Sequence, residues 1–154
     1  MTELLPMVFS SSSLLVMPFW ALMIFAPVWR WTKRIVSSVW IIVPISLVYA
    51  LLVAPDALAI FQTVSNPELA SIQALLGTPA GATFAWVHFL AFDLFVGRWA
   101  YLDSRARNLS PWLVSPILFF ILMLAPLGFV LYMIVRSVLT KPMANQTRQP
   151  LVSG

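Results

Sequence analysis

The chain has 154 residues, of which 61% are hydrophobic and 9% are charged, against roughly 25% charged residues in ordinary soluble domains. With a mean hydropathy of +0.94, this composition predicts an all-α, polytopic integral membrane protein. The absence of cysteine and the single histidine exclude disulfides, thiolate metal sites and histidine-rich metal centres. The net charge of +4 comes from scattered arginines and lysines rather than from a basic patch, so nucleic acid is not expected as a partner.

Hydropathy predicts a four-helix transmembrane bundle, with spans at about residues 13–29, 35–54, 83–102 and 111–137. Residues 1–139 are therefore expected to form one membrane domain, in which residues 1–12 are a short, polar, serine-bearing lead to the first span. Residues 140–154 are expected to form a flexible polar tail. The first span is interpreted as a retained helix rather than a signal peptide, because no basic residue precedes Arg30. In the fourth span, Pro126 and Gly128 predict a kink.

The second loop, residues 55–82, is longer and more polar than the other connections. Asn66 followed by Pro67 predicts the start of a short helix, which Gly77 ends. Its apolar residues Leu69, Ile72 and Leu76 share one face. We expect this helix to lie at the membrane interface or to cap the bundle; the alternative is a loop helix packed on the spans.

The two short turns that follow the first and third predicted spans are basic, with Arg30, Lys33, Arg34, Arg105 and Arg107. The positive-inside rule therefore places these turns in the cytoplasm or its organellar equivalent. With four spans, both termini then lie on the opposite side. Three basic residues oppose this orientation, namely Arg136, Lys141 and Arg148.

The third predicted span carries His88, Asp93 and Arg98 within an apolar segment. A charged side chain at the bilayer centre costs about 2.5 to 3.5 kcal/mol, so these residues are the candidates for function. At 100° per residue, His88 and Arg98 each lie roughly 140° from Asp93 around the helix. The three cannot form one site on a single helix, and Gly97 would let another helix approach beside Asp93.

Asp93 has three interpretations. As a structural clamp, it would bond a hydroxyl of another span, such as Ser46, Tyr49 or Tyr132. As a functional acid, it would be kept neutral by the surrounding hydrocarbon and would donate a proton to a bound substrate. As a proton-coupled transport site, it would need a water-filled path, for which the other spans offer little polar lining.

His88 and Arg98 also have alternatives. A neutral imidazole on an apolar helix is most often hydrogen-bonded to a carbonyl, but it can also act as a general base or ligate the metal of a haem or pigment. Arg98 lies about one turn from the basic interface, where its guanidinium can extend to the headgroups or pair with an acid.

Two stretches carry a resemblance to a known family: W-V-H-F-L-A-F-D-L-F-V-G-R at Trp86 to Arg98 and A-P-L-G-F at Ala125 to Phe129. They resemble the abscisic-acid-deficient-four family, the neoxanthin-synthase-like membrane proteins of chloroplasts and their bacterial relatives. The first half of the chain matches only in hydropathy. Because the first 29 residues hold no basic residue, we expect no plastid transit peptide and a bacterial, cyanobacterial member in the thylakoid or plasma membrane.

The resemblance implies a role in xanthophyll metabolism, which in plants is the conversion of violaxanthin to neoxanthin. That isomerisation needs a proton delivered to the epoxide oxygen and another removed from the neighbouring polyene carbon, and no redox cofactor. Asp93 and His88 are the predicted catalytic residues. A substrate-binding set is predicted to hold the polyene, namely Trp86, Phe89, Phe92, Phe95 and Arg98. No metal is expected, and a carotenoid or other pigment is the expected bound group.

Two alternatives belong to other functional classes. The first is a non-catalytic assembly or pigment-binding subunit of a photosynthetic membrane complex. The second is a small proton-coupled transporter. All three functions would use the same polar helix, and they differ in what its polar groups face.

Overall fold

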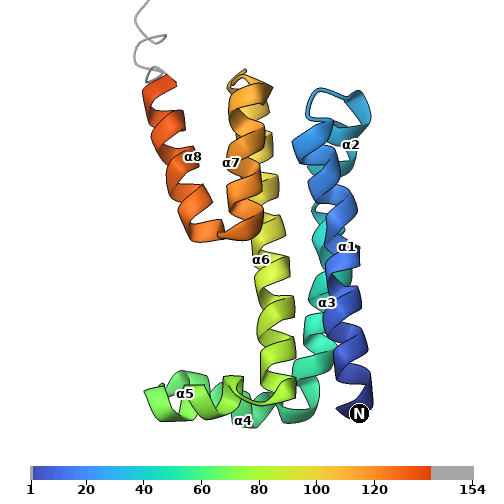
Figure 1. The fold of residues 1–154 in the computed structure, drawn as a ribbon, viewed down its shortest axis with the longest axis vertical. Coiled ribbons are helices and arrows are strands. Elements are labelled where there is room, and N and C mark those ends of the chain that lie inside the picture. Colours follow the sequence, from blue (N-terminus) through green and yellow to red (C-terminus); the bar gives the residue numbers. More distant parts are fainter. Residues whose placement is uncertain (1, 140–154) are drawn as a thin grey trace, which may run out of the picture.

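The structure is a computed structural model that describes residues 2–139. Every regular element in this part of the chain is helical, so the prediction of an all-α protein is confirmed (Figure 1). Three segments of the described chain are long and apolar enough to cross a membrane, namely Leu5–Phe25, Val39–Ser65 and Pro79–Ala106. The predicted polar tail, residues 140–154, lies outside the described residues.

The first helix, α1 (Leu5–Phe25), follows the single turn η1 (Thr2–Leu4). It therefore begins about two turns before the predicted start near residue 13. The serines that suggested a polar lead are accommodated within the helix, because the Ser11 hydroxyl donates to the Met7 carbonyl at 2.6 Å and the Ser12 hydroxyl to the Phe9 carbonyl at 2.8 Å. Such bonds let a serine sit in a helix without an unsatisfied hydroxyl.

The basic segment after α1, predicted as a turn, forms the helix α2 (Arg30–Ser37). The chain reverses just before it, where the Thr32 hydroxyl donates to the carbonyl of Ala26 at 2.7 Å. The second candidate span then consists of four successive pieces: η2 (Val39–Ile42), α3 (Val43–Val53), η3 (Ala54–Asp56) and α4 (Ala57–Ser65). Pro44 and Pro55 each lie in the first turn of a piece, where a missing N–H leaves no helical bond unmade.

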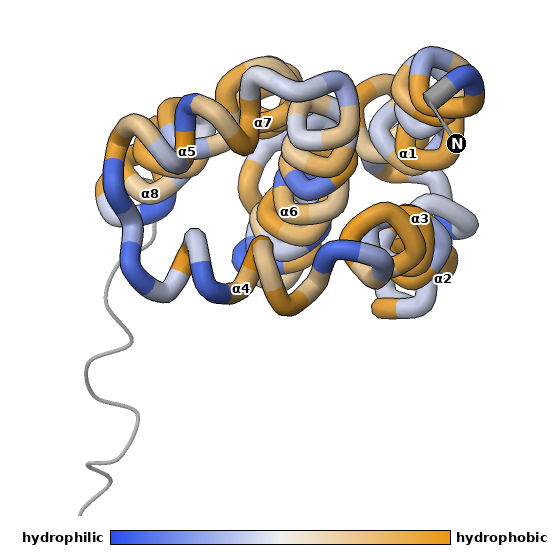
Figure 2. The backbone as a smooth tube through the Cα atoms, turned by 90° about the horizontal axis from the view of Figure 1, so that it is seen from below, coloured by the Kyte–Doolittle hydropathy of each residue, from blue (hydrophilic) through white to orange (hydrophobic). Residues whose placement is uncertain are grey.

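The helices α4 and α5 (Leu69–Leu76) form the foot of the molecule and run across its long axis rather than along it (Figures 1 and 2). The predicted short helix in the second loop thus exists. The helix begins at Leu69, two residues after Pro67, and the backbone of Glu68 is still extended. It ends at Gly77 as predicted, where the Gly77 N–H donates to the Gln73 carbonyl at 2.9 Å. Its placement at a membrane interface stays a prediction.

The central helix is α6 (Pro79–Ala106), against which α1, α3, α7 and α8 all pack. It is continuous over 28 residues, as the absence of an interior proline predicts. Another helix does pack closely against Gly97, as predicted, but it does so through a side chain and not through its backbone. A Cβ at Gly97 would lie 2.7 Å from Cζ3 of Trp20 on α1, so the missing side chain makes room for the buried indole.

The fourth predicted span, 111–137, is not one kinked helix but two antiparallel ones, α7 (Pro111–Met123) and α8 (Ala125–Leu139) (Figure 1). The chain leaves helical geometry at Leu124, with φ −147° and ψ 74°. Pro126 then lies in the first turn of α8, where it disrupts no helical hydrogen bond. We call α7 and α8 together the hairpin.

Two contacts show that the hairpin reverses fully. A Cβ at Gly128 would lie 2.6 Å from Cα of Ile121, so the two arms touch through the glycine. Arg136 pairs with Asp103 near the end of α6, whereas in a continuous helix it would lie about 37 Å beyond Pro111 at 1.5 Å per residue. With 13 and 15 residues, the arms are about 20 to 22 Å long, too short to cross the ~30 Å hydrocarbon layer.

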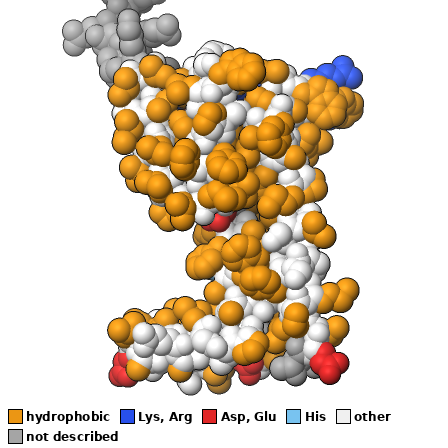
Figure 3. Space-filling model, viewed as in Figure 1, with side chains coloured by type: hydrophobic (Ala, Val, Ile, Leu, Met, Phe, Trp, Pro, Cys, Tyr) orange, Lys and Arg blue, Asp and Glu red, His pale blue; other side chains and the backbone are white. Residues whose placement is uncertain are grey.

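The hairpin also changes the charge distribution. We call the end of the molecule where α6 finishes and α2 and α7 begin the basic end. Arg136 lies there through its pair with Asp103, not on the opposite side as predicted. The described part of α8 finishes at that end as well, opposite the start of α1 (Figure 1). The prediction that both termini share one side of the membrane assumed four full spans, and it stays a prediction. Acidic side chains mark the foot (Figure 3).

Candidate functional site

A cleft of about 730 Å³ lies between the middle of α6 and the tip of the hairpin. Figure 3 shows the molecule hollowed between the hairpin and the foot. One wall is formed by residues of α6, namely Trp86, His88, Phe89, Leu90, Phe92, Asp93 and Val96. The other wall is formed by the hairpin tip, namely Leu122, Met123, Leu124, Ala125, Pro126 and Phe129. The polar stretch of α6 and the A-P-L-G-F segment, which are far apart in the sequence, thus face each other across the cleft.

The lining of the cleft is apolar and aromatic except for two side chains, Asp93 and His88. Phe89 and Phe92 on α6 are more than half exposed, at 57% and 58%. Exposed aromatic rings in a concave, mostly apolar wall are suited to a flat apolar ligand, while a few polar groups set its orientation. The predicted catalytic pair therefore lies where an apolar ligand would bind.

Asp93 is partly buried in this wall, and it makes no hydrogen bond or ion pair within residues 2–139. The hydroxyls proposed as its clamp are engaged or placed elsewhere. Tyr132 donates to Asp103 at 2.6 Å, the ring of Tyr49 packs against His88, and Ser46 is exposed on α3. The structural-clamp interpretation thus finds no partner among the described residues, and the carboxyl is available to a ligand.

His88 is held by aromatic rings, and its imidazole makes no hydrogen bond with residues 2–139. Its imidazole stacks on Phe92, with centroids 4.6 Å apart and planes 25° apart, and lies 5.3 Å from the Tyr49 ring of α3. It is five residues before Asp93, about 7 to 8 Å along the axis. The two side chains point to different sides of α6 but line the same cleft, so a ligand that touches both must bridge a helix groove.

The predicted substrate-binding set divides in two. Trp86, Phe89 and Phe92 line the cleft, whereas Phe95 and Arg98 do not. Phe95 is 49% exposed, outside the cleft. Arg98 Nε donates to the Val36 carbonyl at 2.8 Å, and one of its terminal nitrogens donates to the Ser37 carbonyl at 2.6 Å. These carbonyls end α2, where a cation also complements the helix dipole.

The cleft wall that the hairpin contributes was not predicted from the sequence. Phe129 and the residues from Leu122 to Pro126 were assigned to a continuous fourth span. Pro126 was the available signal, because a proline in an apolar helix marks either a kink or a break. A break near Pro126 would have predicted two short helices, with the second folding back toward the third span.

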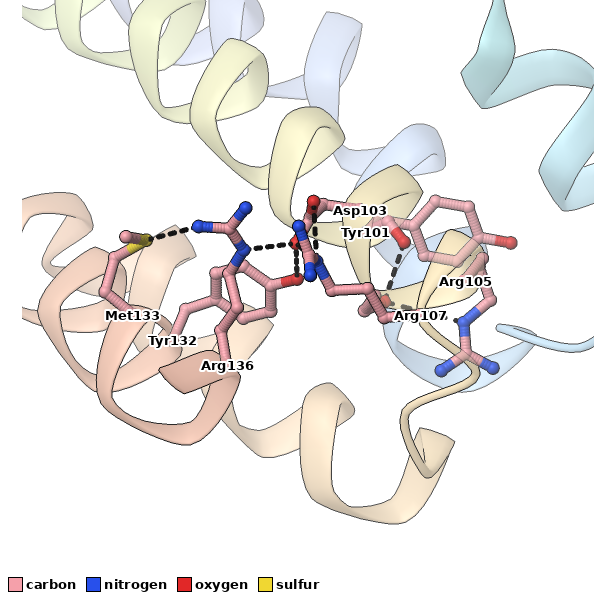
Figure 4. A network of polar contacts seen from close by, with 8 residues as sticks. Tyr101, Asp103, Arg105, Arg107, Tyr132, Met133 and Arg136 are labelled. Atoms are coloured by element: carbon pink, nitrogen blue, oxygen red, sulfur yellow. Dashed lines mark hydrogen bonds and ion pairs between the residues drawn. The ribbon is translucent and has the colours of Figure 1, made fainter. Parts of the chain in front are cut away.

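One carboxylate anchors the hairpin on α6 (Figure 4). Asp103 accepts hydrogen bonds from Arg107 Nε at 2.9 and 3.0 Å and from the Tyr132 hydroxyl at 2.6 Å, and it pairs with Arg136 Nε at 3.0 Å. The Arg136 guanidinium also lies 5.8 Å from the ring centre of Trp99. This cluster fixes the outer end of α8, and thereby holds the hairpin tip over the cleft.

Comparison with known proteins gives two matches. The family model described as ABA DEFICIENT 4-like matches residues 7–132, a range that includes both walls of the cleft. The chain is also 26% identical over 144 residues to Protein ABA DEFICIENT 4, chloroplastic, of Arabidopsis thaliana. That alignment covers 90% of the chain but 64% of the relative, so the chain spans less than two thirds of the relative's length. No solved structure matches the chain.

Proposed function

The chain belongs to the ABA DEFICIENT 4-like family, and from this premise we propose that it is a membrane protein that binds a carotenoid-like lipid in the cleft between α6 and the hairpin. The observation that carries the proposal is that Asp93 and His88 both line a cleft of otherwise apolar and aromatic side chains. Such a wall favours a ligand that is mainly hydrocarbon and carries an oxygen function at one end.

The cleft has room for an end group and the adjoining part of a polyene. At about 730 Å³, it lies within the range of roughly 300 to 1,000 Å³ found for small-molecule sites. Trp86, Phe89 and Phe92 offer their faces to the conjugated chain. The remainder of the ligand extends past the exposed ring of Phe95, among the lipid tails.

The chemistry that fits these groups is an isomerisation of an epoxide end group. Asp93 donates a proton to the epoxide oxygen as one of its C–O bonds breaks, and His88 takes a proton from the neighbouring polyene carbon. The electron pair of the broken C–H bond forms the new double bond. The product is an isomer with a hydroxyl group, and return of the proton from His88 to Asp93 restores the enzyme. No oxidant or reductant is needed.

The experiment is complementation in a carotenoid-producing host that lacks this protein, with pigments separated by liquid chromatography. Asp93→Asn keeps the shape of the side chain but removes the acid, so turnover of a xanthophyll epoxide falls at least about 100-fold, the usual scale for a lost general acid. Asp56→Asn is the matched control, because Asp56 is exposed in η3, outside the cleft, and it keeps full turnover.

Binding is tested separately on protein purified in mild detergent. Wild type and Asp93→Asn both retain a pigment that absorbs visible light. Full turnover by Asp93→Asn would eliminate the acid role and leave the non-catalytic pigment-binding alternative. A colourless preparation of folded wild type, even after incubation with carotenoid, would overturn the binding proposal itself.

The orientation that accompanies this proposal has the basic end on the cytoplasmic side of a thylakoid or plasma membrane. The hairpin then enters the bilayer from that side and ends near mid-membrane. Because the chain has no cysteine, single-cysteine variants report sidedness directly. Ser110→Cys at the basic end is labelled by an impermeant maleimide from the cytoplasmic side, whereas Ser71→Cys in α5 is labelled from the other. The reverse pattern would invert the orientation.

A further inference from the structure

A second cavity, of about 550 Å³, lies at the basic end. It is formed by two turns that are far apart in the sequence, the one between α1 and α2 and the one between α6 and α7. The Asp93 cleft lies at the other end of the hairpin, and the two cavities share no lining residue. This basic cavity is therefore separate from the proposed ligand site.

The basic cavity concentrates positive charge. Arg30 and Lys33 from α2 and Arg105 from the end of α6 line it, and no acidic residue of the described chain does. Arg30 and Lys33 form no ion pair within residues 2–139, and the nearby Asp103 is engaged by Arg107 and Arg136. Three cations that face one hollow repel one another, and a bound anion relieves this repulsion.

The turns that carry these cations are held together before any ligand binds. The Tyr101 hydroxyl donates to the Pro27 carbonyl at 2.8 Å, which ties the α1–α2 turn to the last turns of α6. Arg105 donates to the carbonyl of Leu109 within its own turn. Asn108 has a positive φ of 55°, which reverses the chain tightly between α6 and α7. A preformed site loses less entropy on binding.

The rim of the basic cavity is apolar, and this feature identifies the source of the anion. Val28 and Trp29 line the cavity and are 76% and 52% exposed. Exposed indoles at the end of membrane helices lie at the headgroup level, beside glycerol and the first acyl carbons. A soluble phosphate would make no contact with this apolar rim. A phospholipid would contact the cations with its phosphate and the rim with its glycerol and acyl chain.

We infer that the basic cavity binds an anionic membrane lipid through the phosphate of its headgroup. Arg30, Lys33 and Arg105 contact the phosphate oxygens, while Val28 and Trp29 contact the glycerol and upper acyl chain. The bound lipid bridges the α1–α2 and α6–α7 turns, so it reinforces the contact between α2 and the start of the hairpin. This inference does not depend on the chemistry at Asp93.

The test measures lipid binding to the full chain in detergent, by native mass spectrometry and by thermal stabilisation. Phosphatidylglycerol binds to the wild type, and phosphatidylcholine, which has no net charge, binds at least tenfold more weakly. The double variant Arg30→Gln/Lys33→Gln loses at least tenfold in affinity for phosphatidylglycerol. Equal binding of the two lipids, or an unchanged affinity in the double variant, overturns the proposal.

Arg34→Gln is the matched control. Arg34 and Arg30 belong to the same helix, and their guanidinium groups lie 5.4 and 5.3 Å from the ring centre of Trp31, but only Arg30 lines the basic cavity. Arg34→Gln therefore keeps the affinity of the wild type. An equal loss in this variant would mean that general surface charge attracts the lipid, and the assigned site would be wrong.

Inorganic phosphate distinguishes the two sources of the anion. It competes with phosphatidylglycerol only weakly if the apolar rim contributes, and competition at equal concentration would overturn the lipid assignment in favour of a soluble anion. If the double variant does not elute as a monodisperse protein, Lys33→Gln alone provides the measurement, because no hydrogen bond or ion pair of the Lys33 side chain is present in the described chain. An unchanged affinity in that variant contradicts the inference.

Discussion

Arg136 of α8 and Asp103 of α6 form an ion pair, with Nε and Oδ2 3.0 Å apart, although the whole of α7 lies between them in the sequence. Their side chains are 28% and 17% exposed, so solvent screens this pair less than an ordinary surface pair. Asp103 also accepts from Arg107 and Tyr132. A single carboxylate therefore joins three groups and connects α8 to α6.

Removing the charge of that carboxylate should loosen the hairpin. Asp103→Asn leaves Arg107 and Arg136 without their counter-charge, and we expect a loss of about 1.5 to 3 kcal/mol in stability, the usual range for hydrogen bonds to charged groups. Thermal unfolding in detergent measures it, at roughly 2 to 4 °C per kcal/mol for a chain of this size. Asp56→Asn, at an exposed position, keeps the wild-type melting temperature. An unchanged melting temperature in Asp103→Asn would show that the network does not anchor α8.

The close contact between the hairpin arms gives a second prediction. Gly128→Ala places a methyl group 2.6 Å from Cα of Ile121, so α7 and α8 must move apart, at a cost of about 1 to 3 kcal/mol or more. We expect a lower yield of monodisperse protein and a lower melting temperature. Gly77→Ala is the control, because the added methyl group there meets only carbonyl oxygens of its own helix α5. Equal behaviour of the two variants would contradict the packed hairpin.

The aromatic residue that the hairpin contributes to the cleft tests whether both walls bind the ligand. Phe129→Ala removes a ring from the cleft wall, and we expect the affinity for a carotenoid to fall about tenfold. Full burial of an aromatic side chain is worth about 1.5 to 3 kcal/mol, and a ligand would cover only part of this ring. Phe120→Ala, on α7 but outside the cleft, is the control. Titration of detergent-purified protein, followed by visible absorbance, decides between a two-walled site and binding on α6 alone.

Arg98 was predicted to bind substrate, but it is placed to stabilise the end of α2. Arg98→Gln leaves the carbonyls of Val36 and Ser37 without their charged donor, and we expect a loss of about 1.5 to 3 kcal/mol in stability with pigment binding unchanged. Arg98→Lys, which keeps the charge but not the forked geometry, recovers part of the stability. A variant of normal stability that has lost its pigment would instead support the original assignment.

Much of this protein is predictable from sequence patterns that act locally. The density of apolar residues predicts membrane helices, since each long apolar segment must satisfy its own backbone hydrogen bonds in lipid. The polar positions His88 and Asp93 are conspicuous for the same reason, because hydrocarbon makes them costly. Both lie in the cleft, and the segments that carry the family resemblance form its two walls.

The errors concern places where distant residues decide between local options. Arg98 was predicted to bind substrate, to extend to the headgroups or to pair with an acid, and in the structure it donates to two carbonyls at the end of α2. The serines near the start of α1 were predicted to form a polar lead, yet Ser11 and Ser12 each donate to a carbonyl about one turn earlier in α1. The local sequence does not show which acceptor such a side chain will bind. For Arg98 the acceptors lie about 60 residues away and come within reach only when α2 packs against α6.

The sequence itself determined the polar stretch of α6, through the cost of charge in hydrocarbon, and it marked an irregularity near Pro126, because proline is unfavourable inside a helix. Tertiary structure alone decided that the chain reverses after Leu124 instead of continuing across the membrane. The reversal depends on the close approach at Gly128 and on the pair between Asp103 and Arg136. Such contacts join residues far apart in the chain, and they turn the helix with Asp93 into one wall of a cleft.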